Sequence, residues 1–237
     1  MSTIYYITQD DIENKETLTS FIYANKEVSY YYSDNFDEDF YIMLANVGFI
    51  SVSHSEEGKQ YLIPEMQKEY AVIDFQNLHI SKKVHKMLKK PHLYNFLVSN
   101  NIENVAAGIQ KYHSDNWMEK EYLHLLYKLQ DYKHQYIDFE LLSCELQCTQ
   151  TGDVIAGEIG YRINSTYTSL SGFTTKEKQY NNYGKLQMTL LAKYLEKNHY
   201  SFWNMGHPYM QYKIDLGATI LSREDFLLKW LKKVQRN

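Results

Sequence analysis

Apolar runs in the second half of the chain predict a series of consecutive β-strands. Three such runs follow one another: Tyr136–Gln147, Val154–Ile163 and Thr166–Phe173. The dipeptides Gly152-Asp153 and Asn164-Ser165 stand between them, and both are typical of tight hairpin turns. The pattern therefore predicts an antiparallel meander of three strands.

The segments before and after this meander show the spacing of apolar residues that is typical of helices. In Met118–His134 the apolar face consists of Tyr122, Leu125, Leu126 and Leu129, which is the spacing of a buried helix face. Further helices are expected at Ser81–Lys90, Ile102–His113, Asn182–Asn198 and Arg223–Val234, and further strands at Leu93–Val98 and Tyr200–Asn204. Ser222 is the expected cap of the last helix, with Asp225 three residues on in a variant of the capping box.

The first seventy or so residues alternate short strands and helices. Extended segments are expected at Ile4–Ile7, Val28–Tyr32, Phe49–Ser53, Tyr61–Pro64 and Tyr70–Phe75, and helices at Asp10–Ala24 and Asp37–Asn46. Ser33 or Asp34 would cap the second helix and Gly48 would end it. The order of elements predicts an α+β protein with a small N-terminal α+β domain over residues 1–74. A second domain over 75–237 would hold a mostly antiparallel mixed sheet flanked by helices.

Composition narrows the class of protein. The chain has 237 residues, of which 44% are hydrophobic, enough for a sizeable core. It has no apolar run near 18 residues and no secretory leader pattern, so we expect a soluble, cytoplasmic protein without membrane contact. We expect a monomer. The 23 tyrosines are interpreted as a habit of the source genome.

The cysteines and histidines predict neither a disulfide nor a metal site. Cys144 and Cys148 lie on one expected strand, where four residues span roughly 13 Å, too far for a disulfide. The nine histidines are scattered along the chain, and no His/Cys set has the spacing of zinc ligands. We therefore expect no metal.

A run of lysines stands out against the acidic chain, whose formal net charge is -4. Ser81 is a plausible helix cap, and five lysines follow within nine residues: Lys82, Lys83, Lys86, Lys89 and Lys90. They span more than two helical turns and would cover a broad face. Such a face suits a phosphate backbone; the alternative is an ordinary solvated helix surface.

The residues around this helix resemble a known family. Leu78-His79-Ile80-Ser81 followed by a basic helix resembles the signature that opens the catalytic domain of leucyl/phenylalanyl-tRNA–protein transferases. Further blocks resemble the family in the same order: Val47-Gly48-Phe49-Ile50, Tyr61-Leu62-Ile63-Pro64, Trp117, Gly152 to Gly160, and Leu216-Gly217-Ala218. The resemblance implies an acyltransferase fold of the GCN5 (GNAT) type. It also implies transfer of an amino acid from charged tRNA to the N-terminus of a protein or peptide, with aminoacyl-tRNA as co-substrate and no bound cofactor.

This sequence departs from the family pattern at the residues that carry the family's chemistry. Ser169-Leu170-Ser171-Gly172-Phe173 stands where the family has Gly-Glu-Ser-Met-Phe, and Asn204-Met205-Gly206 stands where it has Asp-x-Gln. By the resemblance, Asn204 would orient the ester carbonyl or the amine, although an amide cannot take a proton. His207 could accept a proton; alternatively, it is only a helix-start residue before Pro208.

The resemblance also implies a set of substrate-binding residues: Trp117, Leu170, Ser171, Phe173 and Gly206. Trp117 would help to position the terminal adenosine or the aminoacyl group, or else be a core residue at a helix start. Phe173 is by default a core residue, although a pocket for an apolar aminoacyl side chain uses the same residue types. An aminoacyl ester is already activated, so proximity and hydrogen-bond donors at the developing oxyanion supply most of the catalysis.

Two other functions stay open at the level of the sequence. Gln179 to Leu186 opens a helix where GCN5-type enzymes bind the pyrophosphate of acetyl-CoA. It has a single glycine, Gly184, with Asn182 where the first glycine of that pattern is expected. A CoA-dependent N-acyltransferase is therefore one alternative. A catalytically silent protein that retains the tRNA-binding surface is the other.

Overall fold

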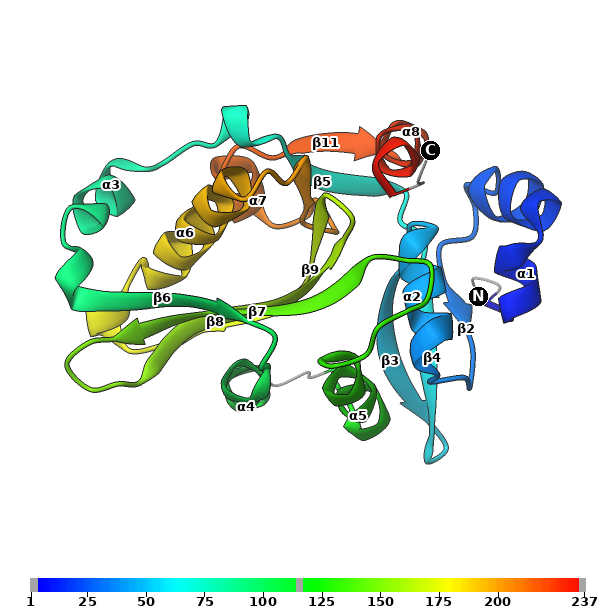
Figure 1. Ribbon diagram of the computed structural model, residues 1–237, viewed down its shortest axis with the longest axis horizontal. Helices are drawn as coiled ribbons and strands as arrows, with labels where there is room; N and C mark the ends of the chain where they lie inside the picture. The colour runs from blue at the N-terminus through cyan, green and yellow to red at the C-terminus, as the bar shows by residue number, and fades with distance from the viewer. Residues whose placement is uncertain (1–3, 114–116, 235–237) are drawn as a thin grey trace.

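A seven-stranded sheet organises residues 4–113 and 117–234, the part of the chain that the computed structural model describes (Figure 1). The strand order is β11-β5-β10-β9-β8-β7-β6. Neighbouring strands are antiparallel except β9 and β10, which are parallel. The strands are β5 (Glu69–Ile73), β6 (Tyr94–Ser99), β7 (Phe139–Cys148), β8 (Val154–Ile163), β9 (Thr166–Thr174), β10 (Phe202–Asn204) and β11 (Thr219–Ser222). The predicted α+β class with a mostly antiparallel mixed sheet is confirmed.

The three-stranded meander is formed as the sequence predicts, and β8 has the predicted bounds. Gly152 and Asn164 have positive φ angles in the two turns, +77° and +49°, a region that glycine and asparagine enter most readily. Between β8 and β9 the register shifts: Ile159 pairs with Ser171 and Gly160 pairs with Ser169. The residue between those two partners is therefore a β-bulge, a feature that re-aims side chains.

Helices cover both faces of the sheet (Figure 1). They are α2 (Glu38–Asn46), α3 (Lys82–Leu88), α4 (Glu103–Tyr112), α5 (Lys120–Leu129), α6 (Tyr183–Lys197), α7 (Gln211–Asp215) and α8 (Arg223–Val234). One hydrophobic cluster joins α2, α4, α5 and α8 to one face of the sheet, and two others join α6 to the opposite face. Short 3-10 turns lie at Phe75–Asn77, Pro91–Leu93 and Lys178–Tyr180. No helix within the described ranges is long and apolar enough to cross a membrane.

The helix predicted over Asp10–Ala24 is wrong, because the segment is divided in two. α1 covers Gln9–Glu13, and a π-helical segment, η1, covers Thr17–Tyr23. Asn14 divides them: its side-chain oxygen accepts hydrogen bonds from the N–H groups of Glu16 and Thr17, at 3.0 Å each. An asparagine that captures the next N–H groups in this way starts a new helical turn instead of continuing the old one.

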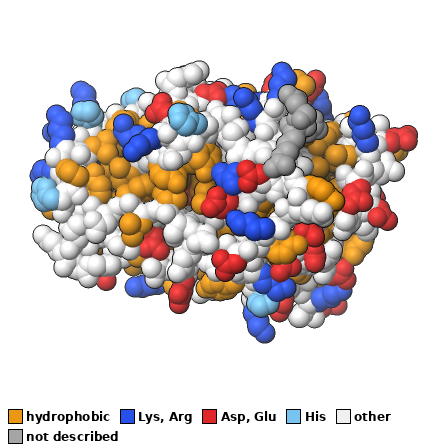
Figure 2. All heavy atoms as spheres, viewed as in Figure 1, with side chains coloured by type: hydrophobic (Ala, Val, Ile, Leu, Met, Phe, Trp, Pro, Cys, Tyr) orange, Lys and Arg blue, Asp and Glu red, His pale blue; other side chains and the backbone are white. Residues whose placement is uncertain are grey.

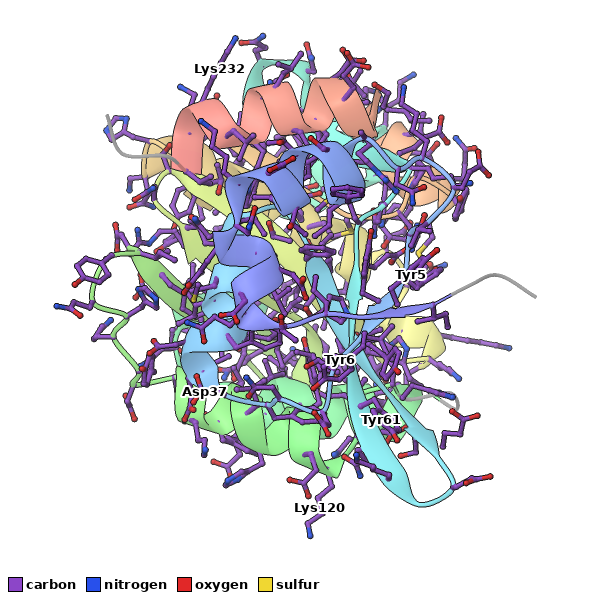
Figure 3. All side chains as sticks on the ribbon, turned by 90° about the vertical axis from the view of Figure 1, so that its right-hand side faces the viewer. Tyr5, Tyr6, Asp37, Tyr61, Lys120 and Lys232 are labelled. Carbon is purple, nitrogen blue, oxygen red and sulfur yellow. The ribbon has the colours of Figure 1, made fainter. Side chains whose placement is uncertain are left out.

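The cap predicted for α2 is also wrong. Asp37, not Ser33 or Asp34, accepts hydrogen bonds from the first N–H groups of the helix, at 2.9 Å from Asp39 and 3.3 Å from Phe40 (Figure 3). Ser33 is instead paired with β4 through a bridge to Leu62. The cap lies directly before the first helical residue because only there does a short side chain reach the free N–H groups.

The N-terminal part holds the remaining strands: β1 (Tyr5–Tyr6), β2 (Tyr31–Tyr32), β3 (Ile50–Glu56) and β4 (Lys59–Glu65). β5 precedes residue 74 yet pairs with β10 and β11 in the large sheet. One hydrophobic cluster also includes residues from both sides of that position. The division into domains at residues 74 and 75 stays a prediction. The segment Gln211–Ser222, for which no element was predicted, contains α7 and β11.

Arg223 links the start of α8 to the N-terminal part through hydrogen bonds. The side chain is 3% exposed, and its guanidinium donates to the carbonyl oxygens of Asn25, Val28, Met66 and Gln67. The planar, five-donor guanidinium is suited to such a set of acceptors. One side chain at the start of α8 therefore ties together two segments that are far from it in sequence.

Replacing Arg223 with methionine should lower the free energy of unfolding by about 3 kcal/mol or more, because several buried carbonyls lose their donor. Urea denaturation measures the change. Lys232→Met, on the exposed side of the same helix, should change stability by less than about 0.5 kcal/mol. Equal stability of the Arg223 variant and the wild type would show that this guanidinium does not hold the two parts together.

Candidate active site

The end of β10 and the end of β4 meet in a seam between the large sheet and the N-terminal part. The seam is defined here as the turn of residues 204–207 and the facing residues 65–67. Met205 donates to the carbonyl of Ala71 at 2.9 Å, and Ala71 donates to the carbonyl of Gly206 at 2.8 Å. This pair of backbone hydrogen bonds fixes the turn against β5 on the N-terminal side.

Asn204 shapes the turn from inside. It is 1% exposed; its Oδ1 accepts from the N–H of Gly206 at 3.0 Å, and its Nδ2 donates to Thr168 Oγ1 at 3.4 Å. Gly206 has φ +69°, which favours glycine. A Cβ at Gly206 would lie 3.6 Å from Nε2 of Gln67. The turn therefore passes close to the facing segment without a side chain between them.

Lys213 holds the same turn from the side of α7. Its side chain is 6% exposed, and Nζ donates to the carbonyls of Met205 and His207, the latter at 2.7 Å. Burial lowers the pKa of Lys213 to about 8, while the Glu158 carboxylate acts in the opposite sense. Like Arg223, this cation binds backbone carbonyls and so fixes a segment of chain.

His207 and Glu65 form a direct pair across the seam. His207 Nε2 lies 2.9 Å from Oε2 of Glu65, and the imidazole stacks on Tyr209 at 5.3 Å between ring centroids. Glu65 is 5% exposed, whereas the His207 side chain is 36% exposed. Burial, followed by the nearby Glu65 carboxylate, raises the pKa of Tyr30 to about 12. A carboxylate that holds one imidazole nitrogen fixes the ring orientation and leaves the other nitrogen for chemistry.

Three of the predicted substrate-binding residues belong to one hydrophobic cluster on this side of the sheet. Phe173 is a buried member, and Trp117 and Leu170 pack against it half-buried. Leu170 is the bulged residue of β9, and Trp117 meets Tyr122 edge-on at 5.1 Å. Ser171 is half-buried in the same strand. Gly206 lies in the seam instead, beside Asn204 and His207.

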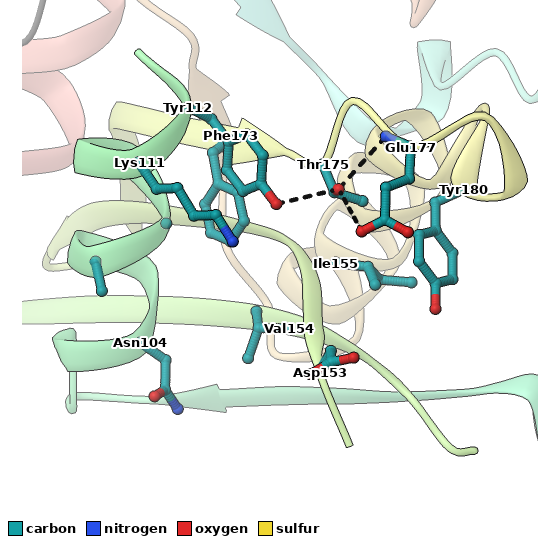
Figure 4. Close-up of a pocket in the computed structure, with 12 residues that line it drawn as sticks. Asn104, Lys111, Tyr112, Asp153, Val154, Ile155, Phe173, Thr175, Glu177 and Tyr180 are labelled. Carbon is teal, nitrogen blue, oxygen red and sulfur yellow. Dashed lines mark hydrogen bonds between the residues drawn. The ribbon is translucent and has the colours of Figure 1, made fainter. Parts of the chain in front are cut away.

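Phe173 also lines a cavity of about 380 Å³ between α4 and the segment that leads to α6 (Figure 4). Its ring stacks on Tyr112 with centroids 5.6 Å apart. The Tyr112 hydroxyl donates to Thr175 Oγ1 at 3.2 Å, and Lys111 also lines the cavity (Figure 4). Neither Asn204 nor His207 lines it. The structure therefore separates the predicted catalytic residues from this cavity.

The predicted basic helix is present as α3, with Ser81 as its cap, accepting from Val84 N–H at 3.3 Å. Val84 is buried, and all five lysines are exposed: Lys82, Lys83, Lys86, Lys89 and Lys90. None of them forms an ion pair within residues 4–113 and 117–234. Their charges are therefore free to meet an external polyanion.

An apolar depression lies next to α3. Figure 2 shows hydrophobic side chains gathered over α6 between α3 and β6, with basic and histidine side chains around them. A cavity of about 190 Å³ lies between α3, α6 and α7, and its lining includes His79, Ser81, Met188 and Tyr212. The Leu-His-Ile-Ser segment therefore borders both the lysines and an apolar pocket.

Sequence reasoning missed a buried polar cluster beneath α6. Glu158 is 6% exposed, and burial raises its pKa to about 7, although hydrogen bonds from Ser169 and Tyr167 oppose that shift. Ser169 donates to Glu158 at 2.6 Å and accepts from Trp203 Nε1 at 2.7 Å. The signal in the sequence was a glutamate within an apolar strand that is buried on both faces.

The structure gives Gly184 a packing role. A Cβ there would lie 3.3 Å from Thr174, so close contact between α6 and β9 accounts for a glycine at this position. Cys144 and Cys148 are free and buried. Within the described ranges no group of three or more His, Cys, Asp and Glu side chains could hold a metal ion.

Comparison with known families gives one match. The sequence model of the leucyl/phenylalanyl-tRNA protein transferase family matches residues 72–231. The matched segment begins in β5 and ends in α8, so it includes α3 and the turn of residues 204–207. A comparison with curated proteins finds no match.

Several solved structures are similar to the chain at low identity. FemX is 10% identical, with 90% of this chain and 76% of that chain covered and a TM-score of 0.46. L-PGS from Bacillus licheniformis is 14% identical, with 86% of this chain covered and a TM-score of 0.43. The chain spans 61% of the length of that structure. A GCN5-related N-acetyltransferase from Kribbella flavida is 10% identical, with 90% and 73% covered and a TM-score of 0.39.

The raised pKa of Glu158 predicts a measurable pH dependence of stability. At pH values between 4.5, the usual pKa of a glutamate, and about 7, Glu158 is ionised in the unfolded chain but keeps its proton in the folded protein. The free energy of unfolding therefore falls as pH rises through this window. Glu158→Gln cannot ionise, so between pH 5 and 7 it should gain about 1 kcal/mol per pH unit relative to the wild type in urea denaturation.

Ser169→Ala is the matched control for this effect. It keeps the Glu158 carboxyl and removes a hydrogen bond that lowers its pKa, so the window should move to higher pH. The same pH dependence in the wild type and in Glu158→Gln would show that Glu158 does not titrate there.

Proposed function

The chain belongs to the leucyl/phenylalanyl-tRNA protein transferase family, and we propose that it transfers an amino acid from charged tRNA to an amino group of a protein or peptide. The observation that carries the proposal is the family match over 72–231, which includes five exposed lysines without ion-pair partners in the described ranges. We infer that the protein works as a monomer in the cytoplasm with aminoacyl-tRNA as its co-substrate.

The proposed reaction needs positioning more than activation. The acceptor nitrogen attacks the ester carbonyl carbon, the ester C–O bond breaks, and the ribose oxygen of the tRNA leaves with a proton. No covalent intermediate on the protein is required, because the ester is already activated. Holding the amine and the ester in contact supplies most of the rate enhancement. A group that removes the proton of the amine supplies a further part.

Asn204 and His207 have different parts in this proposal. Both polar groups of Asn204 are engaged inside the fold, with Gly206 and Thr168. Asn204 is therefore a positioning residue that sets the turn, and the half-buried imidazole of His207 would face the substrates. Trp117, Leu170 and Phe173, which share one hydrophobic cluster, would contact the aminoacyl group together with Ser171 of β9.

α3 would bind the donor. α3 buries Val84 and packs Met87 and Leu88 on the core. Its exposed residues are Lys82, Lys83, His85 and Lys86, and the exposed Lys89 and Lys90 follow directly after the helix. A row of lysines attracts phosphates without reading bases. Selection of the amino acid must then take place at the aminoacyl group, away from α3.

Reversing the charge at Lys82, Lys83 and Lys86 to glutamate should abolish tRNA binding without unfolding the protein, because these side chains are exposed. The wild-type affinity should fall steeply with salt, and each lost phosphate contact should reduce the log–log slope by about 0.7 to 0.9. Fluorescence anisotropy with labelled tRNA measures both.

The matched control for the α3 variant reverses three exposed lysines elsewhere, Lys15, Lys120 and Lys232; Figure 3 shows the last two. This control has the same net charge and should retain most of the affinity. If the two triple variants lose affinity equally, binding depends on net charge, and α3 is not the donor site.

Asn204→Ala should lower the rate of transfer by about one to three orders of magnitude, because it removes the side chain that sets the turn of His207, and a displacement of about 1 Å can cost about 100-fold. Affinity for tRNA should stay nearly unchanged, because the phosphate contacts lie on α3. The assay combines separately charged tRNAs with peptides that have different N-termini. Asn198→Ala, which removes an exposed hydrogen bond at the end of α6, is the control and should keep the wild-type rate.

Asn204→Asp restores the residue of the family pattern. A gain of leucyl or phenylalanyl transfer to peptides with N-terminal Arg or Lys would mark a drifted enzyme with the family's reaction. If this variant is inactive while the wild type transfers another amino acid, the site has been rebuilt for a different substrate. If the wild type, Asn204→Ala and Asn204→Asp all fail to transfer any amino acid, the enzyme proposal is contradicted and a silent tRNA-binding protein is favoured.

A further inference from the structure

The cavity of about 190 Å³ between α3, α6 and α7 has an apolar base. Val84 and Leu216 line it and are buried, and Met188 of α6 is half-buried in the lining. The ring of Tyr212 adds an aromatic side chain, 38% exposed. Because exposed and buried residues share the lining, the cavity opens to solvent. An apolar recess with an aromatic wall suits a flat ring.

The volume of the cavity limits the ligand to one ring system. An apolar cavity of about 150 Å³ holds a benzene ring, so this cavity has room for a single heteroaromatic base and not for a base pair. A base inside a duplex is also covered by its neighbours on both faces. Only an unpaired base can therefore be inserted, which is how proteins usually read RNA.

Positive charge lies directly beside this recess. Ser81 lines the cavity and is followed by Lys82 and Lys83. α3 has seven residues and is about 10 Å long, so Lys86 is also close. None of these lysines forms an ion pair within residues 4–113 and 117–234. A flat ring with a phosphate attached, which is a nucleotide, matches both the recess and the charge beside it.

Hydrogen bonds tie the walls of the cavity to one another. The backbone N–H of His79 donates to the carbonyl of Leu216 at 2.9 Å. Its ring nitrogen Nδ1 donates to the carbonyl of Asp215, also at 2.9 Å. The Asp215 carboxylate is paired with Lys185 of α6 at 3.4 Å, which offsets its repulsion of an anionic ligand. The recess is therefore formed before a ligand arrives.

α7 places the recess next to the candidate catalytic turn. Tyr212 and Asp215 of this helix line the cavity. Lys213, between them in the chain, donates to the carbonyls of Met205 and His207. One helix of five residues therefore contributes to both the recess and the turn of residues 204–207.

We propose that this recess receives one unpaired base from the single-stranded end of the donor tRNA. This inference rests on the proposed function. The base stacks on Tyr212 and contacts Met188, and the neighbouring phosphates lie on the lysines of α3. The single-stranded end fits better than a tRNA loop, because its ester must reach the turn that α7 supports. The lysines attract any strand, and the recess selects one with an unpaired base.

The first experiment uses a mononucleotide and NMR of labelled methionine methyl groups. Cytidine 5′-monophosphate at millimolar concentration should shift the Met188 methyl resonance, and ribose 5-phosphate, which has no base, should not. Met43, in the hydrophobic cluster on the opposite face of the sheet, is the internal reference. Equal shifts with both compounds would indicate an anion site only, and no shift with either would leave the recess without a ligand. Both results would overturn the base site.

The second experiment removes the aromatic wall. Tyr212→Leu should lower the affinity for tRNA by about fivefold or more, the lower end of the loss for one stacked base. The salt dependence should stay unchanged, because no charge is lost. The matched control is Tyr127→Leu, at a tyrosine that is also 38% exposed on a helix, and it should keep the wild-type affinity.

A shortened tRNA that lacks its single-stranded end should bind the wild type and Tyr212→Leu equally. Met188→Trp fills the recess from α6 and should cause the same loss with intact tRNA, so it keeps the test decisive if Tyr212→Leu disturbs α7. Wild-type affinity for intact tRNA in a folded variant of either kind would overturn the base site.

CoA is the other source of the same chemistry, because it carries an adenosine phosphate. A tighter response of the Met188 methyl to CoA than to a short single-stranded RNA would overturn tRNA as the occupant. Intact tRNA that shifts this resonance without any transfer would contradict the proposed function and support the site. Transfer by an enzyme whose Met188 resonance does not respond to tRNA would overturn the site alone.

Discussion

The buried guanidinium of Arg223 is the constraint on which the rest of the structure depends. Its hydrogen bonds reach Asn25, Val28, Met66 and Gln67, so a residue that starts the last helix fixes the N-terminal part against the sheet. Two of these carbonyls belong to the segment that forms one wall of the seam. Since a buried cation requires most of its donors to be satisfied, this arrangement tolerates little displacement. The position of Met66 and Gln67 relative to the start of α8 is therefore tightly fixed.

Lys213 has the same function on the opposite wall. Arg223 fixes the segment of Glu65 and Gln67, and Lys213 fixes the turn that carries His207. Arg223 directs its hydrogen bonds to backbone carbonyls and the Ser29 hydroxyl, and Lys213 directs its own to backbone carbonyls. Both positive charges therefore hold backbone segments in place.

Much of the fold could be predicted from local pattern, and little of the site. β8 was predicted to the residue, and the basic helix was found with its cap, because side-chain periodicity and caps depend on residues only a few positions apart. The helix over Asp10–Ala24 failed because one asparagine outweighed the periodicity. Glu65 and Gln67 follow Pro64 without any motif of their own, and Glu158 had only its polarity inside an apolar strand as a signal.

The sequence by itself determined the elements, the cationic surface of α3 and the family that these residues resemble. The tertiary structure alone decided that His207 meets Glu65, from which it is 142 residues away in the chain, and that Asn204 is engaged inside its own turn. Local geometry limits each segment to a few conformations. Which buried acceptors and donors face one another depends on how distant segments pack, and the free energy of that packing is shared among residues that no local pattern connects.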